Sequence, residues 1–457
     1  MGKITLREAA AWCGGFVEEK YADITFFGAN NDTRLIQPGE LFVVLRGERD
    51  GHAYIPAAFD KGAAAVLCTK KVGDFPAIYV DDPRTALGDI ARQERLRLGT
   101  KVIGVTGSVG KSTTKEMIAW VLESTFRTHK TPVNHNNDIG MPMAILAMPE
   151  NTQVAVLEMG MNHFREMAYL SGIAQPDMAV IVNIGTMHIE YLGSVEGICR
   201  AKLEILEGMQ PDGELLLNGD DVMLTNLPRV PAQKVTYFGT RKNSAVWAED
   251  VCQDGGLLRF NAHLGDTSVP IALALEGDHF VIDALAAIAV AEKLGVGAEQ
   301  IRQRLDTFRN LEGRQETFEA KGYTIIKDCY NAGPESMEAA LNVLGNRPGR
   351  RIAVLGDMLE LGMCTQAEHY RVGRIAAEKA DMVFAFGPNS SRVLSGCITG
   401  GMSERKCKAF TNRDELASEL RRTAKPGDVL LFKGSHGMHM EMILDAFLED
   451  EKEKEGN

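Results

Sequence analysis

The chain has 457 residues, of which 45% are hydrophobic and 25% are charged, and its formal net charge is −12. This composition is typical of a globular protein, and the acidic balance argues against nucleic acids or anionic membranes as partners, because both attract a basic face. The sequence shows no signal peptide and no apolar run near the roughly 20 residues that span a bilayer. Its eight cysteines are scattered and form no C-x-x-C pair. We therefore expect a reduced, cytoplasmic protein without membrane insertion.

Residues 1–83 are predicted to form a small α/β domain. Short apolar runs at 40–45, 64–68 and 77–80 alternate with turns rich in glycine and aspartate. A helix is predicted over residues 83–98, and it leads out of this domain.

From residue 101 the pattern becomes that of a doubly wound sheet. A short β-branched run is followed by a glycine-rich turn and a predicted helix over 111–124, and the continuous apolar runs at 153–159 and 177–185 are typical of buried parallel strands. Strands that alternate with helices predict a parallel sheet covered on both faces. Further predicted elements are strands within 213–276 and helices over 283–294 and 298–308.

A second α/β series begins near residue 313, with predicted strands at 323–329, 351–356, 382–387 and 428–434. Helices fall between these strands, which indicates a separate Rossmann-like domain, and the charged residues 449–457 are expected to form a solvated terminus. The predicted fold class is therefore α/β, with an N-terminal domain (1–83), a central P-loop domain with a doubly wound sheet (84–312) and a C-terminal Rossmann-like domain (313–457).

The segment GVTGSVGKSTTKE (104–116) predicts a phosphate-binding loop. A strand, a glycine-rich turn, a Lys-Ser pair and a helix follow one another, so backbone N–H groups and the helix dipole face a bound anion. Gly107 and Gly110 allow close approach, Lys111 adds a positive charge, and the Ser112 hydroxyl is placed to bind Mg²⁺. The spacing G-x-x-G-K-S is shorter than the usual form, and a plain strand–helix turn is the structural alternative.

Polar residues follow the predicted strands of the central domain. Glu158 ends a strand near the phosphate loop, where a Mg²⁺ ligand is expected, although a helix cap or an ion pair would also explain it. His188 follows the next strand and Lys202 lies on a predicted helix, and each could instead be structural or solvated. A turn-rich loop, which could be no more than loop chemistry, holds three asparagines that could contact a ligand or transition state: Asn134, Asn136 and Asn137.

Taken together, these motifs resemble the Mur ligase family over roughly residues 24–445. The phosphate loop, the asparagine loop and the strand-end motifs occur in the order of that family, and several motifs are similar to its D-alanyl-D-alanine-adding branch. The family motifs are TGSVGKS, NHNNDIG, EMGMNH, NIGTMHIEYLGS with Lys202, NGDD and DCYNAGPESM; those of the branch are NDTRLIQPGELFVVLRGERDGH, LGDMLELG followed by His369, and KGS.

The resemblance implies an ATP-dependent, amide-forming ligase with three domains, acting in peptidoglycan precursor synthesis. Its small-molecule partners would be UDP-N-acetylmuramoyl tripeptide in the first domain, ATP with Mg²⁺ in the second, and D-alanyl-D-alanine brought by the third. A carboxylate would be phosphorylated by ATP, and the dipeptide amine would then attack the acyl phosphate. A monomer is expected.

The resemblance also implies roles for individual residues, each of them an expectation. The UDP-sugar would be held by Asp32, Thr33 and Arg34. The nucleotide would contact Gly107, Ser108, Gly110, Lys111, Ser112, Thr113, Asp283, Arg314 and Asp328. Metal ions would be bound by Ser112, Glu158, His188 and a carbamylated Lys202, and the residues expected to act in catalysis are Lys111, Lys202, His188 and Asn137.

Two segments depart from the family pattern. In GDHFVID (277–283), Phe280 and Asp283 stand where the family commonly has asparagines, and in KGSHGM, His436 stands in place of an arginine. Two alternatives stay open at this point: a related Mur-type or folylpolyglutamate synthetase-like ligase with another substrate, and a P-loop ATPase regulator. The N-terminal domain ahead of the phosphate loop argues against the first, and the third domain argues against the second.

Overall fold

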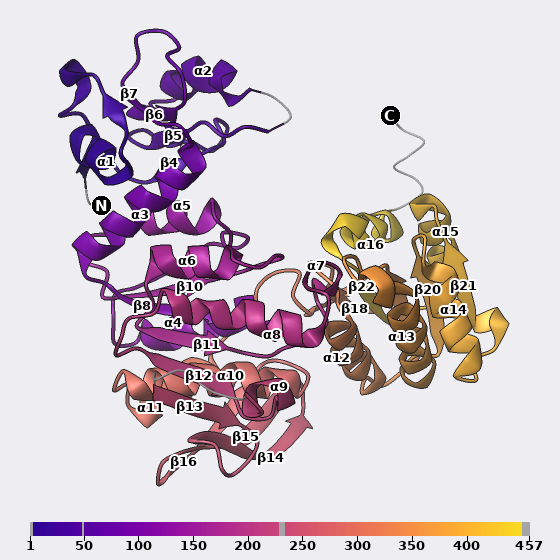
Figure 1. Cartoon of the computed structure of the whole chain (residues 1–457). Helices are drawn as coiled ribbons and strands as arrows, with labels where there is room; N and C mark the ends of the chain where they lie inside the picture. Colours follow the sequence, from indigo (N-terminus) through magenta and orange to yellow (C-terminus); the bar gives the residue numbers. More distant parts are fainter. Residues whose placement is uncertain (1–2, 48–49, 228–233, 450–457) are drawn as a thin grey trace.

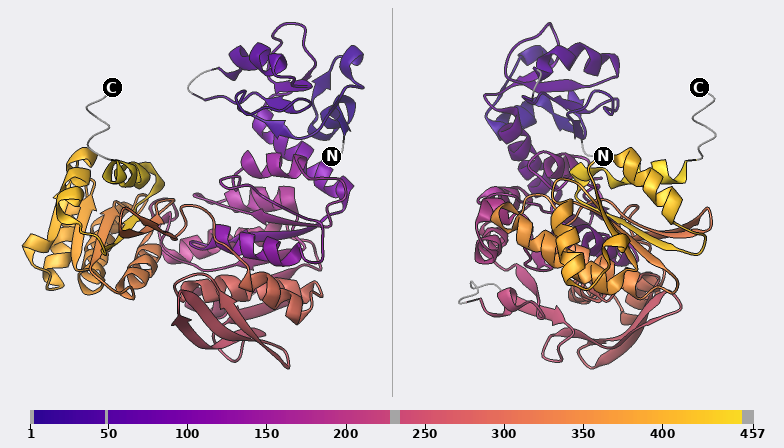
Figure 2. Two further views of the ribbon diagram at one scale, coloured as in Figure 1. Left: turned by 180° about the vertical axis from the view of Figure 1, so that it is seen from behind. Right: turned by 90° about the vertical axis from the view of Figure 1, so that its right-hand side faces the viewer.

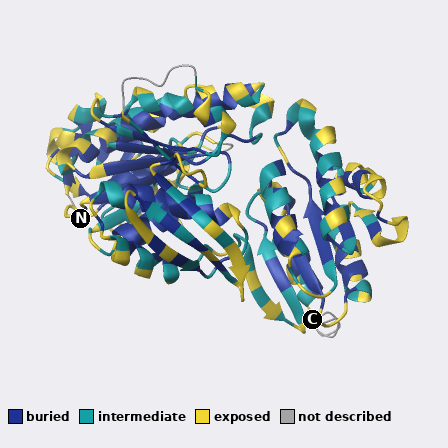
Figure 3. Ribbon diagram, turned by 90° about the horizontal axis from the view of Figure 1, so that it is seen from below, coloured by how far each residue is buried: buried dark blue, intermediate teal, exposed yellow. Residues whose placement is uncertain are grey.

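The computed structural model describes residues 3–47, 50–227 and 234–449. Three larger sheets follow one another along the chain. Figure 1 shows the N-terminal sheet above the central sheet and the C-terminal sheet to the right of it. Helices cover these sheets, and the central strands of each are buried (Figure 3), which confirms the predicted α/β class. The expected solvated terminus lies, from residue 450 on, outside the described residues.

The N-terminal sheet has five strands in the order β2-β7-β6-β5-β4, with β2 antiparallel at one edge and the other strands parallel. The predicted strands correspond to β5, β6 and β7. A separate two-stranded pair, β1 with β3, lies beside it. The elements are β1 (Ile4–Thr5), α1 (Leu6–Cys13), β2 (Phe16–Val17), β3 (Thr25–Phe26), β4 (Ala29–Asn30), β5 (Leu41–Val43), α2 (Ile55–Asp60), β6 (Ala65–Cys68) and β7 (Ala77–Tyr79).

Helix α3 (Pro83–Leu98) connects the N-terminal and central regions and has the predicted bounds. It begins where the Asp82 side chain accepts hydrogen bonds from the amides of Arg84 and Thr85, and it ends at Gly99. Its buried face joins one continuous hydrophobic cluster that includes residues of both regions. This shared core fixes the N-terminal sheet relative to the central one.

The central sheet has nine strands in the order β16-β15-β14-β13-β12-β11-β8-β10-β9. Strands β8 to β13 are parallel, as the continuous apolar runs at 153–159 and 177–185 predicted for β10 and β11, and β8 lies between these two strands. The chain leaves β8 at this topological switch point, where ligands bind in open α/β sheets. The elements are β8 (Lys101–Thr106), α4 (Lys111–Leu122), β9 (Thr128–Lys130), α5 (Gly140–Leu146), β10 (Val154–Glu158), α6 (Glu166–Ala174), β11 (Met178–Ile181), α7 (Ile189–Leu192), α8 (Val195–Leu203), β12 (Glu214–Asn218), α9 (Val222–Thr225) and β13 (Lys234–Gly239).

Strand β14 pairs with β13 in parallel, and the sheet then continues through β15 and β16 as an antiparallel extension. The region predicted to be rich in strands therefore contains both parallel and antiparallel strands. The predicted helix over 283–294 begins earlier, at His279, and its apolar face packs in the same buried cluster as α4. The elements are β14 (Val246–Asp254), β15 (Leu257–Leu264), β16 (Thr267–Leu273), α10 (His279–Lys293) and α11 (Ala298–Asp306).

The C-terminal sheet has six strands in the order β17-β18-β22-β19-β20-β21, all parallel except β17. In the left view of Figure 2, the C-terminal region, coloured orange to yellow, lies beside the central region. Its four inner strands match the predicted ones, whereas the two edge strands were not predicted. In the part of the chain that the structure describes, no helix is long and apolar enough to cross a membrane. The elements are β17 (Glu316–Ala320), β18 (Tyr323–Asp328), α12 (Pro334–Gly345), β19 (Arg351–Gly356), α13 (Thr365–Lys379), β20 (Met382–Phe386), α14 (Ser390–Thr399), β21 (Cys407–Phe410), α15 (Arg413–Thr423), β22 (Val429–Lys433) and α16 (Met440–Leu448).

Candidate active site

The predicted phosphate loop lies between β8 and α4. Gly110 has φ +82°, and a Cβ at this position would lie 2.6 Å from Asp283 Oδ1, so only glycine fits here without strain. The Lys111 amino group donates to the carbonyl oxygens of Gly107 (2.8 Å) and Ser108 (3.2 Å), so it lies over the loop. Burial lowers the pKa of Lys111, and the nearby carboxylate of Glu158 acts in the opposite direction.

Asn183 holds this loop in shape. It begins the motif NIGTMHIEYLGS, but only His188 in this motif and Lys202 after it were predicted to be functional. Its Oδ1 accepts hydrogen bonds from the amides of Ser108 (3.0 Å) and Val109 (2.9 Å), and its Nδ2 donates to the Val109 carbonyl (3.0 Å). The Ser108 hydroxyl in turn accepts from the Gly185 amide (2.8 Å). The loop after β11 therefore braces the loop after β8 across the switch point.

The asparagine loop approaches Glu158 through Asn136. Asn136 Nδ2 donates to Glu158 Oε1 (2.9 Å), and Glu158 is 3% exposed at the end of β10. Asn137, expected to act in catalysis, uses its Oδ1 to accept from the amides of Ile139 (3.2 Å) and Gly140 (2.8 Å), which caps the start of α5. Both asparagines line the same cavity, so the catalytic role of Asn137 stays a prediction.

A cavity of about 960 Å³ contains the phosphate loop and is lined from both the central and the C-terminal regions. A cavity of this size can hold a nucleotide together with part of a second substrate. Gly107, Lys202 and the three residues expected at the UDP-sugar are not among its lining residues. The expected site residues that line it are Ser108, Gly110, Lys111, Ser112, Thr113, Asn137, Glu158, His188, Asp283, Arg314 and Asp328.

The C-terminal region contributes cationic and aromatic side chains to this cavity. Arg314 Nη2 donates to Ser112 Oγ (3.0 Å), and the Arg314 guanidinium lies over the Tyr330 ring at 3.6 Å from its centroid. Asp328 is held by Lys433, whose Nζ donates to Asp328 Oδ2 (2.7 Å). Arg314 and Asp328 thus line the cavity that contains the phosphate loop, and their contact with a nucleotide stays a prediction. Tyr330 and Lys433 were not singled out from the sequence.

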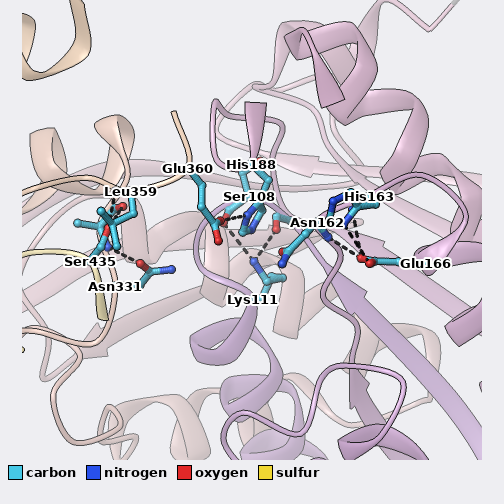
Figure 4. A network of polar contacts seen from close by, with 12 residues as sticks. Ser108, Lys111, Asn162, His163, Glu166, His188, Asn331, Leu359, Glu360 and Ser435 are labelled. Atoms are coloured by element: carbon cyan, nitrogen blue, oxygen red, sulfur yellow. Dashed lines mark hydrogen bonds and ion pairs between the residues drawn. The ribbon is translucent and has the colours of Figure 1, made fainter. Parts of the chain in front are cut away.

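His188 and Lys202 are placed differently from one another. His188 Nδ1 is 2.5 Å from Glu360 Oε2, a contact between the central and C-terminal regions, and Figure 4 draws both side chains with Ser108 and Lys111. Lys202 is 2% exposed on α8, and burial, reinforced by the charge of Lys111, holds its pKa well below the ordinary value. Within the described ranges, the side chain of Lys202 makes no hydrogen bond or ion pair, and no group of three or more His, Cys, Asp or Glu side chains is arranged to hold a metal ion.

Comparison with known proteins shows what kind of protein has this site. Residues 105–291 match the Mur ligase middle domain, and residues 313–436 match the Mur ligase glutamate ligase domain. The chain is 40% identical over 445 residues to the UDP-N-acetylmuramoyl-tripeptide–D-alanyl-D-alanine ligase of Bacillus subtilis, with 95% of this chain and 96% of the relative covered. The chain belongs to the Mur ligase family.

Other Mur ligases resemble the chain over nearly its whole length. The Escherichia coli ligase of the same name is 34% identical, with 94% of this chain and 95% of the relative covered. MurF from Acinetobacter baumannii superposes with a TM-score of 0.90 at 32% identity and covers 98% of this chain and 100% of its own. MurF from Thermotoga maritima, solved in complex with ADP, has a TM-score of 0.82 at 28% identity over 94% and 98%. The expectation of a Mur-type ligase is confirmed.

The residues expected at the UDP-sugar lie on the N-terminal region of this Mur ligase, after β4. Arg34 forms a bidentate ion pair with Asp32, with Nη2 to Oδ2 at 2.6 Å, and this pairing lowers the pKa of Asp32 to about 2. Arg34 and Asp32 therefore satisfy one another. Their assignment to a substrate, with that of Thr33, stays a prediction.

The two departures from the Mur ligase pattern have different surroundings. Asp283 is 3% exposed and accepts a hydrogen bond from Thr114 Oγ1 (2.7 Å), and burial raises the pKa of Asp283 to about 7. Phe280 is 4% exposed and lines the cavity. The His436 ring lies 6.0 Å from the Tyr330 ring, so it is near the edge of the site rather than in the phosphate loop.

Proposed function

We propose that this Mur ligase joins D-alanyl-D-alanine to UDP-N-acetylmuramoyl tripeptide with hydrolysis of ATP to ADP and phosphate, in the synthesis of peptidoglycan precursors. The observation that carries the proposal is the cavity of about 960 Å³ in which the phosphate loop and Arg314 of the C-terminal region face the same space. A site shared by two regions suits a reaction that must bring a nucleotide, an acid and an amine together. Relatives that carry this enzyme name are similar over nearly the full chain.

The residues support an acyl phosphate route. The terminal carboxylate of the tripeptide attacks the γ-phosphorus of ATP, and ADP leaves; the dipeptide amine then attacks the acyl carbon, loses a proton, and phosphate leaves. The first step brings anions together, so positive groups must lie where the charge gathers. Lys111 over the loop and Arg314 on Ser112 are placed for this, with Gly107, Ser108, Gly110 and Thr113 shaping the cradle.

The oxygen atoms of Ser112 and Glu158 fit a Mg²⁺ ion. Both residues line the cavity beside Lys111, and among the described residues only one of the two Glu158 oxygens, Oε1, is engaged, by Asn136. Hydroxyl and carboxylate oxygens are the hard ligands that Mg²⁺ prefers, and a bound ion would supply further neutralisation of the phosphate charge. Asp283 and Asp328 complete the nucleotide side of the cavity.

A second ion would involve His188 and Lys202. Burial lowers the pKa of the Lys202 amine and so favours its neutral form, and a neutral amine reacts with CO₂ to give a carbamate anion and a proton. The carbamate would place oxygen ligands where the buried amine now lies. Lys202 has no competing partner among the described residues, which favours this modification over an ion pair with Glu204 or Glu207.

The remaining assignments follow from the same proposal. Asp32, Thr33 and Arg34 would hold the UDP-sugar, and the domains would be an N-terminal UDP-sugar-binding domain (1–83), a central ATP-binding domain (84–312) and a C-terminal domain (313–457). The enzyme would act as a cytoplasmic monomer on small molecules, without nucleic acid.

A coupled phosphate-release assay tests the proposal. The purified chain should release phosphate from ATP only when a UDP-muramoyl tripeptide and D-alanyl-D-alanine are both present. Release with neither substrate would indicate an ATPase regulator, and release with a folate and glutamate would indicate the related ligase. Parallel assays with a lysine and a diamino acid at the third peptide position would identify the acceptor.

A further inference from the structure

One loop of the central region carries much of the contact with the C-terminal region. Residues 185–191 follow β11, and Figures 1 and 2 show α7, which ends this loop, lying beside the C-terminal sheet. Ile189 packs against the buried cluster of the N-terminal and central regions and also against a buried cluster of the C-terminal region. The loop therefore links two hydrophobic cores that are otherwise separate clusters.

Glu335, in the first turn of α12 of the C-terminal region, holds this loop by hydrogen bonds. Its Oε1 accepts hydrogen bonds from the Thr186 amide (2.9 Å) and the Thr186 hydroxyl (3.0 Å). A Cβ on Gly185 would lie only 2.9 Å from the Glu335 carboxyl carbon, so the glycine allows the carboxylate to come this close. Glu335 Oε2 is buried and has no hydrogen-bond partner among the described residues, so Thr186 is what holds the carboxylate in place.

Glu360 contacts the same loop a few residues further along the chain, through both its side chain and its backbone. Its Oε2 is 2.5 Å from His188 Nδ1, and its backbone carbonyl accepts from the Glu190 amide at 3.4 Å. Both His188 (φ +65°) and Glu360 (φ +61°) have left-handed backbone conformations. Residues other than glycine rarely adopt this conformation unless the surrounding structure holds them in it. Two strained residues from different regions thus meet in one contact, and that contact sets the orientation of the imidazole.

We propose that Glu335 and Glu360 are positioning residues of the ligase reaction. By holding residues 185–191, they fix the His188 ring at the edge of the cavity and keep the C-terminal region, with Arg314, over the phosphate loop. They act through Thr186 and His188. The effect on catalysis rests on the proposed function, whereas the contacts of Glu335 and Glu360 with residues 185–191 do not.

Hydrogen–deuterium exchange of the full chain without ligands tests whether Glu335 and Glu360 hold residues 185–191 in place. Removing the acceptor of the Thr186 amide in Glu335→Ala should speed exchange in peptides covering residues 185–191 by about 2- to 12-fold, the effect of losing one net hydrogen bond. Glu360→Ala should raise exchange at the same peptides. Glu338→Ala is the matched control, because Glu338 lies on the same helix and pairs with Arg371 within the C-terminal region. Unchanged exchange in both test variants overturns the proposal.

Steady-state kinetics with the tripeptide, the dipeptide and ATP test the catalytic consequence. Glu360→Ala should lower kcat about tenfold, with little change in KM for ATP, because the phosphate loop itself is untouched. Glu360→Gln retains an oxygen that can accept from His188 and should recover part of this loss. A kcat in Glu335→Ala and Glu360→Ala equal to that of Glu338→Ala overturns the positioning role even if exchange rises. If the wild-type chain releases no phosphate with these substrates, the proposed function fails instead, and the exchange result still stands.

Discussion

Asp283→Asn should stabilise the protein at neutral and alkaline pH while leaving it unchanged in acid. Asp283 is 3% exposed in α10, and burial raises its pKa from 3.8 to about 7, against the opposing effects of the Thr114 hydrogen bond and the Arg314 charge. An acid whose pKa is higher in the folded state contributes stability that is fully present below the unfolded pKa and is lost as pH rises through the folded pKa. The loss therefore runs from about pH 4 to about pH 7 and is complete above it.

The size of the effect follows from the same shift. A difference of about three pKa units at about 1.4 kcal/mol each makes the ionised carboxylate cost on the order of 4 kcal/mol above pH 7. Asparagine keeps an Oδ1 that can accept from Thr114 Oγ1, as Asp283 Oδ1 does at 2.7 Å, but it carries no charge to bury. The variant should therefore exceed the wild type by up to that amount at pH 8 and by almost nothing at pH 4.

Denaturant unfolding followed by tryptophan fluorescence measures this difference, since Trp120 lies on α4, the helix that also carries Thr114. Unfolding free energies of the wild type and Asp283→Asn should be compared at intervals between pH 4 and pH 8.5. The exposed Asp212→Asn is the control and should run parallel to the wild type. If the curve of Asp283→Asn also runs parallel to the wild type across this range, Asp283 does not titrate there and the reasoning from its burial is refuted.

Three further predictions concern the reaction. Lys111→Ala should lower kcat by on the order of 10²–10³ in a folded protein, because a charge over the phosphate loop is lost; near-normal turnover would contradict its role. Lys202→Ala should be inactive and regain phosphate release with a short-chain carboxylic acid, whereas an active variant would exclude a catalytic carbamate. Small-angle scattering should show the C-terminal region moving as a rigid body when ATP analogue and acceptor bind, and an unchanged profile would count against domain closure.

The sequence predicted the inner strands well and the sheet edges poorly. Strands such as β8 and β22 are buried along almost their whole length, so they appear as unbroken apolar runs. Strand β17 (ETFEA) alternates between half-buried and exposed residues and pairs only with β18, so its charged positions hide it. Helix α10 begins at His279, before the apolar stretch from which its start was predicted.

The same contrast holds for the site. Lys111, Ser112 and Glu158 lie at strand ends that local patterns reveal, because the phosphate loop and the parallel strands fix where those ends meet. Contacts between distant segments have no local signal. Glu335 meets Thr186 across 149 positions and Glu360 meets His188 across 172, and neither carboxylate differs in its neighbouring sequence from one on a solvated surface.

These distant contacts explain why one cavity needs two regions of the chain. The central sheet alone offers a phosphate loop at its switch point, which is enough to bind a nucleotide. In the proposed reaction, an acyl phosphate must also be kept from water until the amine arrives, and that requires a second surface that covers the loop. Arg314 contacts Ser112 in the phosphate loop, and the carboxylates of Glu335 and Glu360 hold residues 185–191 near His188. Both contacts come from the C-terminal region. The contacts that position this region over the phosphate loop would therefore also protect the proposed acyl phosphate from water.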